Sequence, residues 1–255
     1  MLRFHLTDLS GLVLVYLLVF ARTGAMLMLL PPISQAGVPP RVRLVLALAI
    51  SFALAPGLAH SYTAQTPSSG IALGVMVAEE ITAGVLVGAM ASIVMSALSV
   101  AGSLISTQTG LSYAQLLNPT MGDQEPVLGN FLTLLGGVMI FATNLHHLAI
   151  LAIQGSYTLI PPGAALPTAD MAELVIRLVA GSFALGVQLA APFLVFGFAV
   201  NASIGLLARL MPQLQVFFIA MPVNILAGFL VFMLLIGSMM TMFLDFYGAQ
   251  LGSFS

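Results

Sequence analysis

Hydrophobic residues fill most of the chain in six long runs, and polar residues gather in the short stretches between them. The runs cover residues 9–30, 41–55, 71–101, 127–153, 171–207 and 216–246. Most of them reach or exceed the roughly 20 apolar residues that a helix needs to cross a bilayer. The pattern predicts an all-α membrane protein with about six helical segments, partly kinked and arranged as hairpins.

Prolines mark several boundaries of these segments. Pro40 is well placed to open the second helix, because proline suits the first helical position. Pro56 is expected to end that helix near residue 55. Pro192 and Pro222 lie inside the last two runs, so they predict kinks there.

The third run, residues 71–101, is too long for a simple membrane crossing. As a helix it would reach about 46 Å, whereas the hydrocarbon core is only about 30 Å thick. Gly84 and Gly88 form a G-x-x-x-G pair, which favours close helix approach. Glu79 and Glu80 lie near one end of the run. We therefore expect this helix to pack among protein helices more than in lipid.

Residues 102–130 form the one long polar stretch inside the apolar sequence. Its polar side chains are mostly neutral, and its only charges, Asp123 and Glu125, come near its far end. A lipid-facing segment does not tolerate so many polar groups, and a solvated linker would not carry Ile105 or Leu116. We interpret the stretch as a functional loop in a wet or protein-lined cavity.

Composition narrows the function classes. The chain is 60% hydrophobic and 5% charged, against roughly 25% charged in a soluble domain. A net charge of −2 gives no basic face for nucleic acid. The absence of cysteine excludes disulfides and thiolate chemistry. No small-residue cleavage site follows the first apolar run, so we expect the N-terminus to be retained.

Two interpretations remain open for the adjacent carboxylates Glu79 and Glu80. Acidic residues in membrane segments are functional by default, so the pair could carry protons. Alternatively, the pair is structural and is neutralised by a cation such as Arg177 or Arg209.

The histidine pair His146 and His147 also has two interpretations. The pair could bind metal or relay protons, but adjacent side chains on a helix point about 100° apart, and no acid or cysteine completes a cluster. A structural role at a helix end is the alternative. The chain also lacks the sequence motifs of nucleotide binding, metalloprotease and serine hydrolase sites. We therefore expect no enzymatic activity, no cofactor and no metal.

Three separated blocks resemble signatures of the FliR family, a membrane component of the bacterial flagellar protein-export gate. The first is LPPISQAGVPPRVRLVLALAISFALAP, preceded by Arg22. The second is AGSLISTQTGLSYAQLLNPTMGDQEPVL, preceded by Glu80 and followed by Asn144 and His146. The third is RLMPQLQVFFIAMPVNILAG. In the second block Asn118 stands where the family commonly has Asp.

The resemblance implies a core subunit of the flagellar type III export gate in the bacterial inner membrane, at the flagellar basal body. In that family the subunit joins FliP-type and FliQ-type subunits around a closed pore for unfolded flagellar proteins, and it works with FlhB-type and FlhA-type export proteins. Residues 1–175 would be FliP-like and residues 176–255 a FliQ-like hairpin. No nucleic acid is implied.

The resemblance also assigns a pore plug to residues 106–122, with residues 112–117 as its tip. The candidate plug residues are Ser106, Gln108, Gly110, Leu111, Ser112, Tyr113, Ala114, Gln115, Leu116, Leu117, Asn118, Pro119, Met121 and Gly122. Residues expected to pack against other subunits are Glu79, Glu80, Gly84, Gly88, Arg209, Pro212, Gln213 and Pro222.

Three alternatives remain at this point. The injectisome counterpart in virulence secretion would share the fold and the gate role. A small-solute transporter could use Glu79 and Glu80 as its coupling site, but the sequence shows no matching broken helices in its two halves. The third alternative is a passive membrane scaffold, and the polar stretch 102–130 is the only feature that argues against it.

Overall fold

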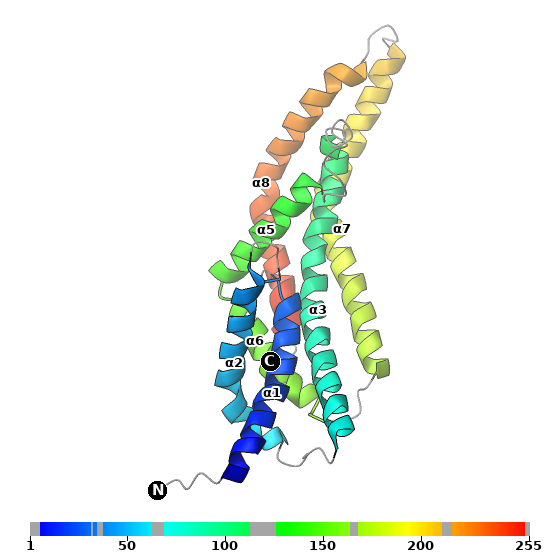
Figure 1. The fold of residues 1–255 in the computed structure, drawn as a ribbon. Helices are drawn as coiled ribbons and strands as arrows, with labels where there is room; N and C mark the ends of the chain where they lie inside the picture. Colours follow the sequence, from blue (N-terminus) through cyan, green and yellow to red (C-terminus); the bar gives the residue numbers. More distant parts are fainter. Residues whose placement is uncertain are drawn as a thin grey trace. The chain divides into compact units, whose positions relative to one another are not determined.

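The computed structural model describes residues 6–31, 33–34, 38–62, 69–112, 126–163, 168–210 and 216–252. Every regular element in these ranges is a helix (Figure 1). The helices are α1 (Leu6–Leu29), α2 (Pro40–Tyr62), α3 (Gly70–Gln108), α5 (Val127–Ala142), α6 (His146–Leu159), α7 (Thr168–Leu210) and α8 (Val216–Gly252).

The membrane character predicted from the apolar runs is confirmed. Five of the described helices are long and apolar enough to cross a bilayer. The pair α5 and α6, taken together as one bent span, would make a sixth. The all-α membrane class with about six segments therefore follows directly from the hydrophobic pattern.

Several helices end later than the sequence predicts, among them α6 at Leu159 and α8 at Gly252. Helix α2 continues through Pro56 to Tyr62, although proline removes one helical hydrogen bond. Helix α3 continues beyond residue 101 to Gln108, into the polar stretch. The hydroxyl of Thr107 donates to the carbonyl of Ser103 at 2.9 Å, so this side chain is satisfied within the helix itself.

The fourth run, predicted as one segment, is broken at residues 143–145. Asn144 has a φ of 61°, in the left-handed region that asparagine tolerates better than most residues. The His147 amide donates to the Asn144 carbonyl at 3.0 Å and so begins the next helix. This turn separates α5 from α6.

The chain groups into two compact units. One contains residues 1–93, 141–176 and 247–255, and the other contains residues 94–140 and 177–246. We call them unit 1 and unit 2. The family resemblance predicts a FliP-like portion and a FliQ-like hairpin. Units defined by spatial proximity do not test that resemblance, so this division stays a prediction.

In unit 1, α1 packs closely on α3 at the glycine pair. A Cβ atom at Gly84 would overlap the carbonyl of Arg22, and one at Gly88 would lie 2.7 Å from the carbonyl oxygen of Met26. The partner in this close approach is thus α1 of the same chain. A role for the two glycines in packing between subunits stays a prediction.

In unit 2, glycines let neighbouring helices reach the second half of α3. A Cβ atom at Gly102 would overlap the backbone of Gly129 on α5. One at Gly186 on α7 would lie 2.9 Å from the carbonyl oxygen of Ala97. These contacts enclose the helix that leads into the polar stretch.

Candidate functional site: a buried charge cluster and a polar neck

A buried arginine lies at the centre of a charge cluster in unit 1. Arg22 of α1 is only 2% exposed. Its Nε donates to Oε2 of Glu80 on α3 at 2.6 Å, and its Nη1 donates to Oγ of Ser156 on α6 at 3.3 Å. Its Nη2 donates to the carbonyl of Ile160 at 3.0 Å. The planar guanidinium therefore joins three separate segments of the chain.

Two tyrosines complete the cluster. The guanidinium carbon of Arg22 lies 3.9 Å from the centroid of the Tyr157 ring, within the range of a cation–π interaction. The ring of Tyr62 meets that of Tyr157 edge to face, with centroids 6.2 Å apart. The Tyr62 phenol also interacts electrostatically with Glu80 and Arg22. Tyr62 is the last residue of α2, so the continuation of α2 past Pro56 brings this ring into the cluster.

The partner expected for Glu80 was wrong. Glu80 pairs with Arg22, not with Arg177 or Arg209. A signal was present in the sequence, since Arg22 interrupts the first apolar run and a cation inside a membrane segment requires a partner. We interpret Glu80 as a structural counter-charge in this cluster.

The polar neck is the buried end of α3 in unit 2. We define it as Ser106, Gln108, Thr109 and Gly110, together with the residues of α7 and α8 that contact them. Ser106 is 1% exposed and Thr109 4% exposed. Serine and threonine side chains are rarely buried so completely, so the neck is a specific feature of this fold.

The local sequence explains how α3 ends in the neck. The Thr109 hydroxyl donates to the carbonyl of Ile105 at 2.9 Å, which satisfies it within the last turn. Gly110 has a φ of 80°, the left-handed conformation that commonly terminates helices and that glycine adopts without strain.

Helices α7 and α8 hold this helix end. The Asn224 side chain on α8 donates from Nδ2 to the carbonyl of Gln108 at 3.3 Å. A Cβ atom at Gly228, one turn further along α8, would overlap the side chain of Thr109. On α7, a Cβ atom at Gly197 would overlap the Gln108 amide. The neck is therefore clamped by a hydrogen bond and two close backbone approaches.

The predicted plug residues divide between described and undescribed parts of the chain. Ser106, Gln108 and Gly110 lie in the neck, and Leu111 and Ser112 follow it, half-buried. The remaining plug candidates lie outside the described residues: Tyr113, Ala114, Gln115, Leu116, Leu117, Asn118, Pro119, Met121 and Gly122.

The C-terminal packing candidates divide in the same way. Arg209, at the end of α7, and Pro222, inside α8, are exposed, whereas Pro212 and Gln213 lie outside the described residues. Sequence reasoning missed Gly197 and Asn224 as individual residues. Asn224 carried a signal, because it is a lone amide in the last apolar run.

The histidines lie closer together than helical geometry predicts. The ring centroids of His146 and His147 are 4.2 Å apart, and that of Phe141 is 5.1 Å from His146. Both histidines lie in the first turn of α6, which follows the turn at Asn144. Within the described residues there is no group of three or more side chains suited to hold a metal ion.

Replacing Gly228 by Ala should open the neck. The added methyl overlaps the side chain of Thr109, so α8 must shift away from the end of α3. The chain lacks cysteine, so Ser106→Cys reports accessibility through its labelling rate with a water-soluble maleimide. We expect faster labelling in the Gly228→Ala background.

The matched control is Gly237→Ala, also on α8, where an added Cβ atom meets nothing within 4 Å. Labelling should keep its original rate in this background. Equal labelling rates in both backgrounds would contradict the clamp.

The fold and the neck together define a helical membrane protein with buried polar residues at the end of one long helix. Residues 13–249 match the family described as Bacterial export proteins, family 1. The chain belongs to this family, and within it to the FliR proteins.

Individual relatives agree with this assignment. The chain is 41% identical over 238 residues to the flagellar biosynthetic protein FliR of Caulobacter vibrioides. This alignment covers 93% of this chain and 94% of the relative. It is 31% identical over 209 residues to FliR of Escherichia coli, with 81% and 78% covered. It is 28% identical over 218 residues to the Yop proteins translocation protein T of Yersinia pestis, with 83% and 81% covered.

Proposed function

We propose that this chain helps to keep the pore of the flagellar type III export gate closed, with the loop that follows the polar neck as its plug. As a FliR-family protein, the chain is a membrane subunit of that gate and works with other subunits of the export apparatus. The observation that carries the plug proposal is the neck. Its contacts with α7 and α8 fix the end of α3, directly before residues 112–117 in the sequence.

The chemistry of the neck suits a closed passage. Its polar side chains are hydroxyls and amides, which form hydrogen bonds without attracting a counter-ion. In the sequence, Tyr113, Leu116 and Leu117 then supply bulk to exclude water. A plug built in this way blocks ions while it is seated and leaves no fixed charge in the path of an unfolded polypeptide.

The partners that we propose are FliP-type and FliQ-type subunits in the ring, FlhB-type and FlhA-type export proteins, and unfolded flagellar proteins as cargo. Helix α7, with 43 residues, is about 65 Å long, roughly twice the thickness of a hydrocarbon core. Its last turns are exposed on all sides within this chain. So much uncovered apolar surface supports burial against other subunits.

The proposed role is mechanical. It requires a segment that moves aside and returns, so it needs no catalytic residue, cofactor or metal. Residues 1–175 as a FliP-like portion and residues 176–255 as a FliQ-like hairpin belong to the same proposal.

Deleting residues 115–118 should make the assembled gate leak ions, because the bulk of the plug is removed while the neck is kept. The measurement is ion flux across proteoliposomes that contain the purified gate. The control deletes residues 64–67, in the connection between α2 and α3, and should leave the membrane tight. An assembled gate that stays tight without residues 115–118 would rule out the plug.

A transporter role is less well supported. Transporter sites are commonly built from broken helices that recur in both halves of the chain. Among the described helices, a bent pair at a short break occurs only at α5 and α6, whereas α7 and α8 are continuous. The injectisome role remains the alternative within the same machinery, and its named relative is less similar to this chain than the Caulobacter protein.

A further inference from the structure

An exposed face of α3 in unit 1 has the spacing of a coiled-coil contact. Its residues follow one another at alternating steps of four and three positions, the pattern found at the seam between two supercoiled helices. The residues of this face are all exposed in the chain: Ile71, Val75, Ala78, Thr82 and Val85. We call them the α3 seam. A different side of the helix packs on α1, through Gly84 and Gly88.

The α3 seam is apolar and long enough for a second helix. Ile71 is 83% exposed, Val75 53% and Val85 41%. The hydroxyl of Thr82 donates to the carbonyl of Ala78 at 2.7 Å, so its hydrogen bond is made within α3 itself. From its first to its last residue the seam extends about 21 Å along the helix axis, or about four turns. A partner helix can therefore pack along several turns of α3.

Glu79 lies at the edge of the seam and has no cation of its own. It follows Ala78 directly, in the flanking position where coiled coils place charged residues that pair with the opposite helix. Glu79 is half-buried, and its carboxylate repels that of Glu80. Arg22 binds Glu80 through Nε, and both of its Nη atoms bind other groups. Among the described residues no salt bridge reaches Glu79, so one negative charge is left over beside the seam.

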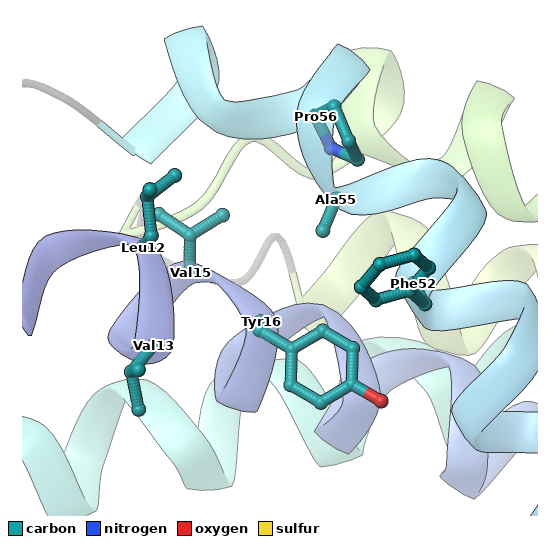
Figure 2. A pocket seen from close by; sticks show the side chains of 7 residues that line it. All are labelled: Leu12, Val13, Val15, Tyr16, Phe52, Ala55 and Pro56. Carbon is teal, nitrogen blue, oxygen red and sulfur yellow. The ribbon is translucent and has the colours of Figure 1, made fainter. Parts of the chain in front are cut away.

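Another apolar region of unit 1 carries no such charge. A hollow of about 520 Å³ lies between α1 and α2 (Figure 2). Its lining residues are Leu12, Val13, Val15, Tyr16, Phe52, Ala55 and Pro56. None of these side chains is charged, so the walls do not distinguish one occupant from another. The α3 seam differs because the carboxylate of Glu79 selects for a cation.

We infer, on the basis of the proposed partnership with other gate subunits, that the α3 seam binds a helix of another subunit and that this helix presents an arginine or lysine to Glu79. Apolar contact along the seam supplies the buried area. The ion pair fixes the register and the choice of partner. A lipid acyl chain would cover the seam but would leave the Glu79 carboxylate without a counter-charge.

Photo-crosslinking in the purified export gate tests this contact. The photoreactive residue p-benzoylphenylalanine replaces Ile81, which is 42% exposed and lies beside the seam without belonging to it. After illumination, peptide mass spectrometry should find a segment of another gate subunit, with an arginine or lysine within about two helical turns of the crosslinked residue. Glu79→Arg should reduce this crosslink several-fold, because two cations then repel each other. Replacing the partner's basic residue by Glu should restore it.

The matched control is Asp170→Arg, which reverses an exposed carboxylate in the first turn of α7 and should leave the crosslink unchanged. Crosslinks to lipid alone, or to a segment without a nearby arginine or lysine, would overturn the pairing. An unchanged crosslink in Glu79→Arg would also overturn it. If that variant does not assemble, the crosslinks made with Glu79 in place still decide the question. Ion flux after deletion of residues 115–118 tests the plug separately, so a failure of either proposal is distinguishable.

Discussion

Replacing Glu80 by Gln should lower the free energy of unfolding by about 3–5 kcal/mol, the usual cost of breaking a buried ion pair by removing one partner. Arg22 would stay buried at 2% exposure without a counter-charge. Thermal unfolding of the purified gate, followed by circular dichroism and by the fraction of intact complex, measures this loss.

Two further variants separate charge from packing. Glu79→Gln changes the neighbouring, half-buried carboxylate and should cost much less. The double variant Arg22→Met, Glu80→Leu removes both charges and should be more stable than Glu80→Gln, because no charge is left unpaired. Equal losses in Glu79→Gln and Glu80→Gln would show that the ion pair does not stabilise the fold.

Replacing Gly102 by Ala should cost about 1–3 kcal/mol, the range for overpacking a well-packed core. The new methyl would overlap backbone atoms of Gly129 and Leu128, which cannot rotate away as a side chain would. Helix α5 would have to move off α3. The same thermal unfolding measurement applies, together with the yield of assembled gate.

Gly74→Ala is the matched control, because it lies on the same helix and an added Cβ atom there meets nothing within 4 Å. Alanine has the higher helix propensity by up to about 1 kcal/mol, so this variant should be neutral or stabilising. If Gly102→Ala behaved like Gly74→Ala, the close contact between α3 and α5 would be refuted.

The helices were predictable because long apolar runs leave the chain few other structures in a membrane. Their ends were less predictable. Pro56 suggested a helix end, but α2 continues to place Tyr62 in the charge cluster. The turn at Asn144 depends on the backbone conformation of one residue, which hydrophobic patterns do not report.

The candidate site was predictable only in part. The polar stretch showed where the neck begins, since neutral polar residues contrast with the apolar runs on either side. Its partners were not visible, because Asn224 and Gln108 are 116 positions apart in the sequence. The pairing of Arg22 with Glu80 likewise depends on how α1 and α3 pack.

The arginine in α1 also bears on biosynthesis. An arginine at the centre of an isolated membrane helix costs about 2.5–3.5 kcal/mol during insertion, and Glu80 follows Arg22 by 58 positions. The nascent chain thus reaches its own neutralising residue only when α3 is being synthesised. The cost of burying this cation is relieved only once α3 is in place, so we expect α1 to reach its final packing after the third helix has been synthesised.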